Sequence, residues 1–316
     1  MSDQIIHMPV NPGDIVGEEH WAKRGDIDLF LYRRYSPKAR AASPDKPVLF
    51  LVHGSSFAAR TAYDLDIPGK GDYSLMRTFA GLGYDVWTMD HEGYGRSTHT
   101  DGFSYIADGV EDLKAAVPVV EAATGRGSFA FFGTSSGALR AGAFANVYPE
   151  RVERMVLAAL VWTGKRSPTL KKRAEKIDEW RATNRRVVDE AAYQAIFTRD
   201  VEGLTVPYLP AAAAAAEMAN GGGSVPNGTY IDMCVNLPAV DPLKIACPVM
   251  IFRGDHDGIA TDEDVMGFFT ALPNKDKQMV MVTGQAHNTS IGINRQRFWH
   301  ALDSFLSIPP RIDNAN

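Results

Sequence analysis

The sequence predicts an α/β fold: a mostly parallel, twisted sheet with helices on both faces and a helical cap inserted into the core. Short apolar runs alternate with helical stretches, as in parallel sheets covered by helices. The stretch 162–240 interrupts this alternation. The chain has 316 residues, whereas one core stops growing at roughly 250–300. We therefore expect a core formed by residues 1–161 and 241–316, with residues 162–240 as the cap.

The strands are predicted from the apolar runs, because parallel strands buried on both faces are almost continuously apolar. An early segment, 26–35, alternates instead, so we expect it to form an antiparallel edge hairpin with 21–23. The parallel strands are expected at 48–52, 84–89, 129–132, 155–161, 249–252 and 278–282.

Four core helices are expected between and after these strands. Asp72 is the expected cap of the first. Pro118 lies inside the second and predicts a kink or an early break there, because proline cannot donate a backbone hydrogen bond. The four ranges are 72–81, 106–123, 136–148 and 298–306.

The interrupting stretch 162–240 contains a basic helical segment, 165–186, and an alanine-rich one, 210–220. Alanine is the best helix former, so we interpret the second as a helix rather than as disorder. Four glycines and Pro226 within 221–229 predict a mobile hinge. No strong strand is expected in this stretch.

Composition excludes several partners and compartments. A formal net charge of −5 without a basic tail disfavours nucleic acid. No apolar run approaches the roughly 20 residues that span a bilayer, and residues 1–14 do not resemble a signal peptide. The two cysteines, Cys234 and Cys247, are too few for a disulfide framework or a structural zinc site and fit a reducing cytosol. We therefore expect a cytoplasmic protein without a membrane partner.

The strongest chemical motif is Gly133-Thr134-Ser135-Ser136-Gly137. It follows an expected strand and precedes an expected helix, which is the context of a G-x-S-x-G nucleophile elbow. The tight turn places the serine in a strained conformation, and larger side chains at either glycine would collide with the turn. The N–H of Ser136, at the start of the helix, is then directed at the position of a tetrahedral oxyanion.

A serine nucleophile needs a base, and the base needs an acid to orient it. Two loops supply candidates. Asp255, His256 and Asp257 follow the strand at 249–252, and His287 follows the strand at 278–282. Both loops lie at the carboxyl ends of expected strands, where open α/β sheets place their sites. A metal site at these residues is disfavoured because no pair has ligand spacing.

In these motifs the sequence resembles the α/β-hydrolase superfamily over about 48–160 and 245–306. The resemblance implies that Asp257 is the triad acid, with Asp255 as the alternative, and that His287 is the base. It also implies that the N–H of Ser55, after His53-Gly54, is the second oxyanion donor. The stretch Asp90 to Ser97 resembles the family's D-x-x-G-x-G-x-S loop and is interpreted as structural.

Substrate clues are fewer. Ser56, Phe57, Trp162 and Tyr230 are expected to contact the substrate, and the aromatic rings fit an apolar or aromatic group. Residues 162–190 carry nine basic and five acidic side chains. Steering of an anionic substrate is one interpretation of this excess, and a solvated helical face is the favoured one.

The sequence therefore predicts a serine hydrolase that cleaves a small to medium carboxylic ester or lactone through an acyl-enzyme, without cofactor or metal. A serine at position 135 excludes the chemistry of relatives that use an aspartate nucleophile. A C–C bond hydrolase or an amidase with the same triad is the alternative among enzymes. A ligand-binding protein that has lost catalysis is the alternative from another class.

Overall fold

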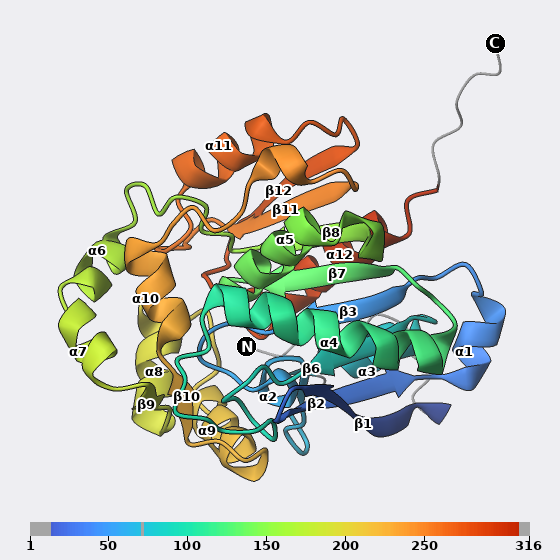
Figure 1. Cartoon of the computed structure of the whole chain (residues 1–316), viewed down its shortest axis with the longest axis horizontal. Helices are drawn as coiled ribbons and strands as arrows, with labels where there is room; N and C mark the ends of the chain where they lie inside the picture. Colours follow the sequence, from blue (N-terminus) through green and yellow to red (C-terminus); the bar gives the residue numbers. More distant parts are fainter. Residues whose placement is uncertain (1–13, 71–72, 310–316) are drawn as a thin grey trace.

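A computed structural model describes residues 14–70 and 73–309 of the chain. Its centre is one eight-stranded sheet with the order β1-β2-β6-β3-β7-β8-β11-β12 (Figure 1). Strand β2 pairs antiparallel with β1 and β6, and the other neighbours are parallel. In sheet order the strands are Val16–Arg24, Ile27–Tyr35, Asp85–Met89, Val48–Val52, Phe129–Thr134, Val152–Ala158, Val249–Gly254 and Lys277–Val282.

All six expected parallel strands and the edge hairpin are present, so the predicted α/β fold class is confirmed. One strand is displaced. The apolar run at 155–161 continues past the end of β8, which stops at Ala158 because Ala159 has a φ of 51° and leaves the extended conformation. Residues 159–161 are buried without belonging to the sheet. The expectation that this apolar run is buried was therefore correct, but the predicted end of the strand was wrong.

Helices cover both faces of the sheet. Side chains of α4 (Ile106–Thr124), α5 (Ser136–Val147) and α11 (Asp262–Ala271) contribute to one apolar core. Those of α2 (Ala59–Tyr63), α3 (Leu75–Gly81) and α12 (Arg295–Leu306) contribute to the core on the other face. Helix α1 (Pro37–Ala42) and the short pair β4 (Asp64–Leu65) and β5 (Tyr73–Ser74) lie between these elements in sequence.

Two expectations about helix ends are corrected. Asp72 lies outside the described residues, and the side chain of Ser74 caps α3 by accepting from the N–H of Arg77 at 2.9 Å. Helix α4 is not broken at Pro118 and continues to Thr124. Pro118 is exposed, as is Lys114 four residues earlier, so water can reach the carbonyl that loses its donor.

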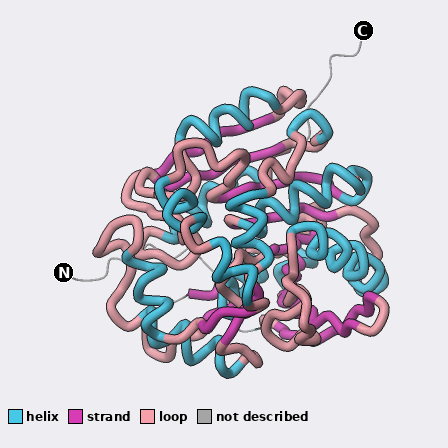
Figure 2. The backbone as a smooth tube through the Cα atoms, turned by 60° about the vertical axis from the view of Figure 1, so that its left-hand side comes forward, coloured by secondary structure: helices cyan, strands magenta, loops and turns pink. Residues whose placement is uncertain are grey.

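Residues 162–240 form helices α6 to α10 and a separate two-stranded sheet, β9 with β10. These elements gather on one side of the main sheet, at the left of Figure 1. In Figure 2 the strands lie in the interior of the molecule, with helices and loops around them. The expected hinge at 221–229 contains β10 and the buried start of α10. In order, the elements are α6 Pro168–Ala174, α7 Ile177–Ala182, β9 Arg185–Val187, α8 Glu190–Thr198, α9 Leu209–Ala219, β10 Ser224–Pro226 and α10 Gly228–Val235.

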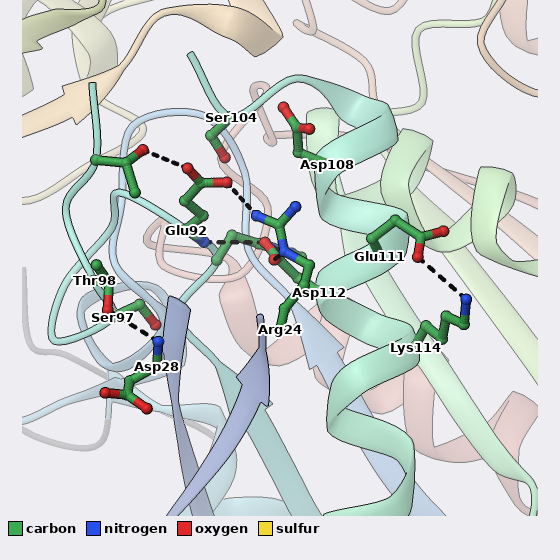
Figure 3. Close-up of polar contacts among 12 residues, drawn as sticks. Arg24, Asp28, Glu92, Ser97, Thr98, Ser104, Asp108, Glu111, Asp112 and Lys114 are labelled. Carbon is green, nitrogen blue, oxygen red and sulfur yellow. Dashed lines mark hydrogen bonds and ion pairs between the residues drawn. The ribbon is translucent and has the colours of Figure 1, made fainter. Parts of the chain in front are cut away.

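An ion-pair cluster connects the edge hairpin to helix α4 and to the loop after β6 (Figure 3). Arg24, at the end of β1, pairs with Glu92 and, through Nε at 2.8 Å, with Asp112 of α4. The second oxygen of Asp112 accepts the N–H of Glu92 at 3.0 Å. Burial raises the pKa of Asp112, and Arg24 opposes that rise. This cluster anchors the loop 90–97, which lies behind the site described next.

Candidate active site

Ser135 stands at the turn between β7 and α5 with φ 56° and ψ −123°, a conformation that costs a non-glycine residue energy. Its N–H donates to the carbonyl of Ala158 at 2.9 Å. A Cβ on Gly133 would overlap the carbonyl of Gly137, and a Cβ on Gly137 would overlap the carbonyl of Val52. Both glycines are therefore required by close backbone approach, as the G-x-S-x-G interpretation predicts.

Asp257 and His287 meet at the carboxyl ends of β11 and β12. His287 Nδ1 lies 2.8 Å from Asp257 Oδ1, and that oxygen also accepts the N–H groups of Ile259 and Ala260 at 2.8 and 3.0 Å. Asp257 is buried. Burial by itself raises the pKa of its carboxyl, but His287 and the two N–H groups outweigh burial, and the pKa is lowered. Asp257 is thus held as a carboxylate at the Nδ1 edge of the imidazole.

The alternative acid has a different environment. Asp255 is exposed, and its Oδ1 accepts the N–H of Gln285 at 3.1 Å. Of the two acids, only Asp257 has a hydrogen-bond distance to the ring of His287 in the described structure. The backbone N–H of His287 donates to Asp200 Oδ2 at 3.1 Å, so a residue of the segment 162–240 also orients the histidine.

Ser135 and His287 line the same cleft. The other residues that line this cleft come from both the core loops and the segment 162–240. Among the sequence-predicted residues, those that line the cleft with Ser135 and His287 are Ser55, Ser56, Phe57 and Tyr230.

Ser55 and Ser136 are joined through their side chains. The hydroxyl of Ser55 donates to that of Ser136 at 2.8 Å, and the hydroxyl of Thr229 donates to Ser55 at 2.8 Å. Both serines are buried. This short chain of hydroxyls holds the loop after β3 beside the start of α5, so the two expected oxyanion donors belong to segments that are fastened to each other.

Further side chains from residues 162–240 hold the same loop. Arg186 Nη2 donates to the carbonyl of Ser55 at 2.5 Å, and the hydroxyl of Tyr193 donates to the carbonyl of Ser56 at 2.9 Å. Glu217 accepts the N–H of Ala58 at 3.0–3.1 Å. The backbone of this loop is therefore set by residues that are more than 100 positions away in the sequence.

The expectation for Trp162 is corrected by the structure. Its N–H donates to Asp264 at 2.8 Å, and its indole Nε1 donates to the carbonyl of Val240 at 3.2 Å. The ring lies edge-on against Phe268, with centroids 5.8 Å apart. Because the chain turns away from the sheet after Ala159, Trp162 packs beside α11 and is not part of the cleft wall.

Sequence reasoning missed Arg173 and Arg199, which both line the cleft. Arg199 forms a two-point ion pair with Asp200, with contacts of 2.8 and 3.0 Å. Arg173 belongs to the basic run 165–186, for which steering of an anionic substrate was one interpretation. A solvated helical face was the favoured interpretation of this run. The other cleft residues that were not expected are Ile196, Met233, Ile259 and Asn288.

Tyr230 lies between two guanidinium groups. The carbon centres of Arg173 and Arg186 are 3.6 and 3.7 Å from the centroid of its ring, and its hydroxyl is 3.3 Å from that of Ser56. Burial raises the pKa of a phenol, but the two arginines oppose it more strongly and lower the pKa of Tyr230 to about 7. Two guanidinium groups therefore lie against Tyr230 at this wall of the cleft.

His53 has a supporting position. Its Nδ1 is 2.8 Å from the carbonyl of Gly54, and its Nε2 accepts the N–H of His91 at 3.2 Å. Burial lowers the pKa of His53 well below its usual value, and His91 and Arg140 add to this effect. A neutral His53 with both ring nitrogens engaged supports the loop, as the sequence interpretation expected.

Within residues 14–70 and 73–309, no cluster of His, Cys, Asp and Glu is arranged to hold a metal ion. Over the same ranges, no helix combines the length and apolarity that crossing a bilayer requires.

Comparisons with known proteins concern the family and the fold of this chain. The family model described as serine aminopeptidase, S33 (Hydrolase_4) matches residues 70–291. No curated protein matches the chain significantly. A bromoperoxidase from Bacillus anthracis aligns with a TM-score of 0.66 at 18% identity, covering 92% of this chain and 100% of that one. A thermophilic esterase from Thermogutta terrifontis aligns with a TM-score of 0.63 at 16% identity, covering 92% and 98%.

A third solved structure is 2-hydroxy-6-oxo-6-phenylhexa-2,4-dienoate hydrolase from Rhodococcus. It has a TM-score of 0.66 and 14% identity, and the alignment covers 93% of this chain and 100% of that one. At such identities these likenesses establish a shared fold, and the differing activities in the three names show how widely that fold is used.

Proposed function

The chain belongs to the α/β-hydrolase superfamily, in the family described as serine aminopeptidase, S33, and from this premise we propose that it is a serine hydrolase acting on small to medium carboxylic esters or lactones. The observation that carries the proposal is the arrangement of three side chains. Ser135 sits in a strained turn of the same cleft as His287, and buried Asp257 lies 2.8 Å from His287 Nδ1.

In the proposed reaction, His287 Nε2 accepts the proton of the Ser135 hydroxyl as its oxygen attacks the ester carbonyl. The N–H groups of Ser55 and Ser136 stabilise the resulting oxyanion. The imidazolium then protonates the departing alcohol, which leaves an acyl group on Ser135. Water, deprotonated by His287, releases the acid and restores the serine. Asp257 keeps the proton on Nδ1 and stabilises the imidazolium that forms twice in the cycle.

We also propose that residues 162–240 act as the cap of this site. Ile196, Tyr230 and Met233 of this segment line the same cleft as Ser135. Apolar and aromatic side chains of this kind select the group attached to the scissile bond. The cap would therefore decide which ester is accepted, while the core loops perform the chemistry.

A fluorophosphonate probe tests the proposal directly, because it phosphonylates an activated serine. We expect labelling of the wild-type chain and no labelling of Ser135→Ala. Absence of labelling in the wild type would contradict catalysis and favour a ligand-binding protein. Labelling that survives in Ser135→Ala would contradict the choice of nucleophile. Thr134→Ser, which retains Ser135 and the turn, is the matched control.

A substrate panel separates the enzyme alternatives. Rapid turnover of activated alkyl and aryl esters supports an ester hydrolase. Turnover of amides at comparable kcat/KM would support an amidase. Hydrolysis of a vinylogous diketone alone would support C–C bond cleavage through the same three residues.

A further inference from the structure

The cleft has more positive than negative charge around it. Arg173 and Arg199 line it, and Arg186 lies behind Tyr230. Two acids at this cleft already have partners: Asp200 pairs with Arg199, and Asp257 pairs with His287. Neither of these carboxylates forms an ion pair with Arg173.

Arg173 is the cation that lacks a partner. No described acid forms an ion pair with it, and its Nη1 atom is buried without a hydrogen-bond partner. Arg199 is neutralised by Asp200, and Arg186 donates to the carbonyls of Ser55 and Pro226 and to the hydroxyl of Ser56. A buried guanidinium N–H without an acceptor costs free energy unless a ligand supplies that acceptor.

The position of Arg173 is fixed. Its guanidinium carbon lies 3.6 Å from the centroid of the Tyr230 ring, which leaves the nitrogen atoms free to donate at the edges of the plane. The backbone carbonyl of Arg173 accepts the indole N–H of Trp180 at 3.3 Å, which holds the end of α6 in place. A planar guanidinium with free N–H groups matches the two oxygens of a carboxylate.

We propose that Arg173 binds a carboxylate of the substrate, so that the preferred substrates are esters or lactones that carry a second, free carboxylate. This inference rests on the proposed hydrolase function and narrows its substrate class. The acyl carbonyl then lies at Ser135, and the free carboxylate lies at Arg173 on the cap side of the same cleft. Tyr230 supplies the aromatic surface against which both Arg173 and Arg186 lie.

The test compares charged and neutral forms of one ester. The probes are 4-nitrophenyl monoesters of succinic, glutaric and adipic acid and the same compounds with the free carboxyl blocked as a methyl ester. Release of 4-nitrophenol gives kcat/KM at pH 6, where the probe carboxylate is ionised and Tyr230 is mostly a neutral phenol. In the wild type we expect the best chain length to favour the charged form by roughly 10- to 100-fold.

Variants assign this preference to one side chain. Arg173→Met is expected to bring the ratio of charged to neutral kcat/KM close to 1, and Arg173→Lys to give an intermediate ratio. The matched control is Lys172→Met, an exposed neighbour on the same helix, which should keep the wild-type ratio. A wild-type ratio near 1 at all three lengths, or a ratio that Arg173→Met leaves unchanged, would overturn the proposal.

A binding measurement keeps the two proposals separate. Calorimetry with Ser135→Ala and glutarate monomethyl ester requires no catalysis. Binding that disappears when Arg173→Met is added supports the carboxylate site, even if the fluorophosphonate fails to label Ser135 and the hydrolase proposal falls. Labelling of Ser135 without any carboxylate binding or charge preference overturns the carboxylate site alone.

Discussion

Replacing one buried carboxyl should make this protein more stable at high pH. Glu217, on α9, is completely buried and accepts the N–H of Ala58. Burial raises the pKa of this carboxyl from 4.5 to about 7, and nearby Asp90 adds to the rise, whereas the hydrogen bonds from Ala58 and Thr61 oppose it. We therefore choose Glu217→Gln, which keeps an acceptor oxygen for Ala58 and removes the charge.

The size and sign follow from linkage. Because the folded pKa lies above the unfolded one, the folded chain holds the extra proton between pH 4.5 and about 7. The contribution of Glu217 to stability is fully present below pH 4.5 and is lost as the pH rises through 7. At 1.36 kcal/mol per pKa unit, this loss is about 3 kcal/mol. Glu217→Gln avoids it, so the variant should match the wild type near pH 4.5 and exceed its stability at pH 8.

Urea unfolding at both pH values measures the effect, with equal m-values as the condition for comparing free energies. The neighbours that titrate with Glu217 are Asp90, whose pKa burial raises to about 6, and the phenol of Tyr193. Both remain in the variant, so the difference from the wild type isolates Glu217 and its coupling to them. Glu202→Gln, at an exposed site, is the control and should leave the free energy of unfolding unchanged at both pH values. A difference that does not grow with pH would refute the reasoning.

Three further predictions concern the site and its frame. Asp257→Asn should lower kcat for ester hydrolysis by about 10⁴-fold with an unchanged circular dichroism spectrum, whereas Asp255→Asn should keep kcat within about 3-fold of the wild type. The opposite result would make Asp255 the triad acid. Gly137→Ala should cost more than roughly 3 kcal/mol in thermal unfolding, because its Cβ meets the Val52 carbonyl, and an unchanged melting temperature would contradict this. Trp162→Phe should cost about 1–2 kcal/mol in stability through its lost hydrogen bond and leave KM unchanged. A raised KM would indicate that Trp162 contacts the substrate.

Local signals were sufficient for the parts of the fold that depend on local chemistry. The run at 48–52 is a strand because it is apolar throughout, and residues 133–137 form a tight turn because two glycines allow close backbone approach. The rule that parallel strands end at one edge of the sheet placed the loops of Asp257 and His287 together, and the resemblance to the α/β-hydrolase superfamily selected these two residues. Each of these inferences needed only a few neighbouring residues.

The remaining features depend on contacts between distant parts of the chain. Pro118 is tolerated because that side of α4 is exposed, which one sequence does not reveal. The end of β8 depends on the conformation of Ala159, and that turn carries Trp162 away from the cleft. Strands β9 and β10 have three residues each and pair across 224–226 and 185–187, too short for an alternating pattern. The place of Arg173 follows from how this segment folds back over the core.

We expect the contacts between the segment 162–240 and the core loops to link substrate specificity to catalysis. Arg186, Tyr193 and Glu217 hold the backbone of the loop that includes Ser55, and the same segment supplies the cleft residues Arg173 and Tyr230. A cap that only shaped the pocket would change KM when mutated. A cap that also sets the direction of the Ser55 N–H changes kcat, because a donor misplaced by even about 1 Å loses much of its effect on the oxyanion. Substitutions at Arg186 should therefore lower kcat, whereas those at Arg173 should act mainly on the preference for charged substrates.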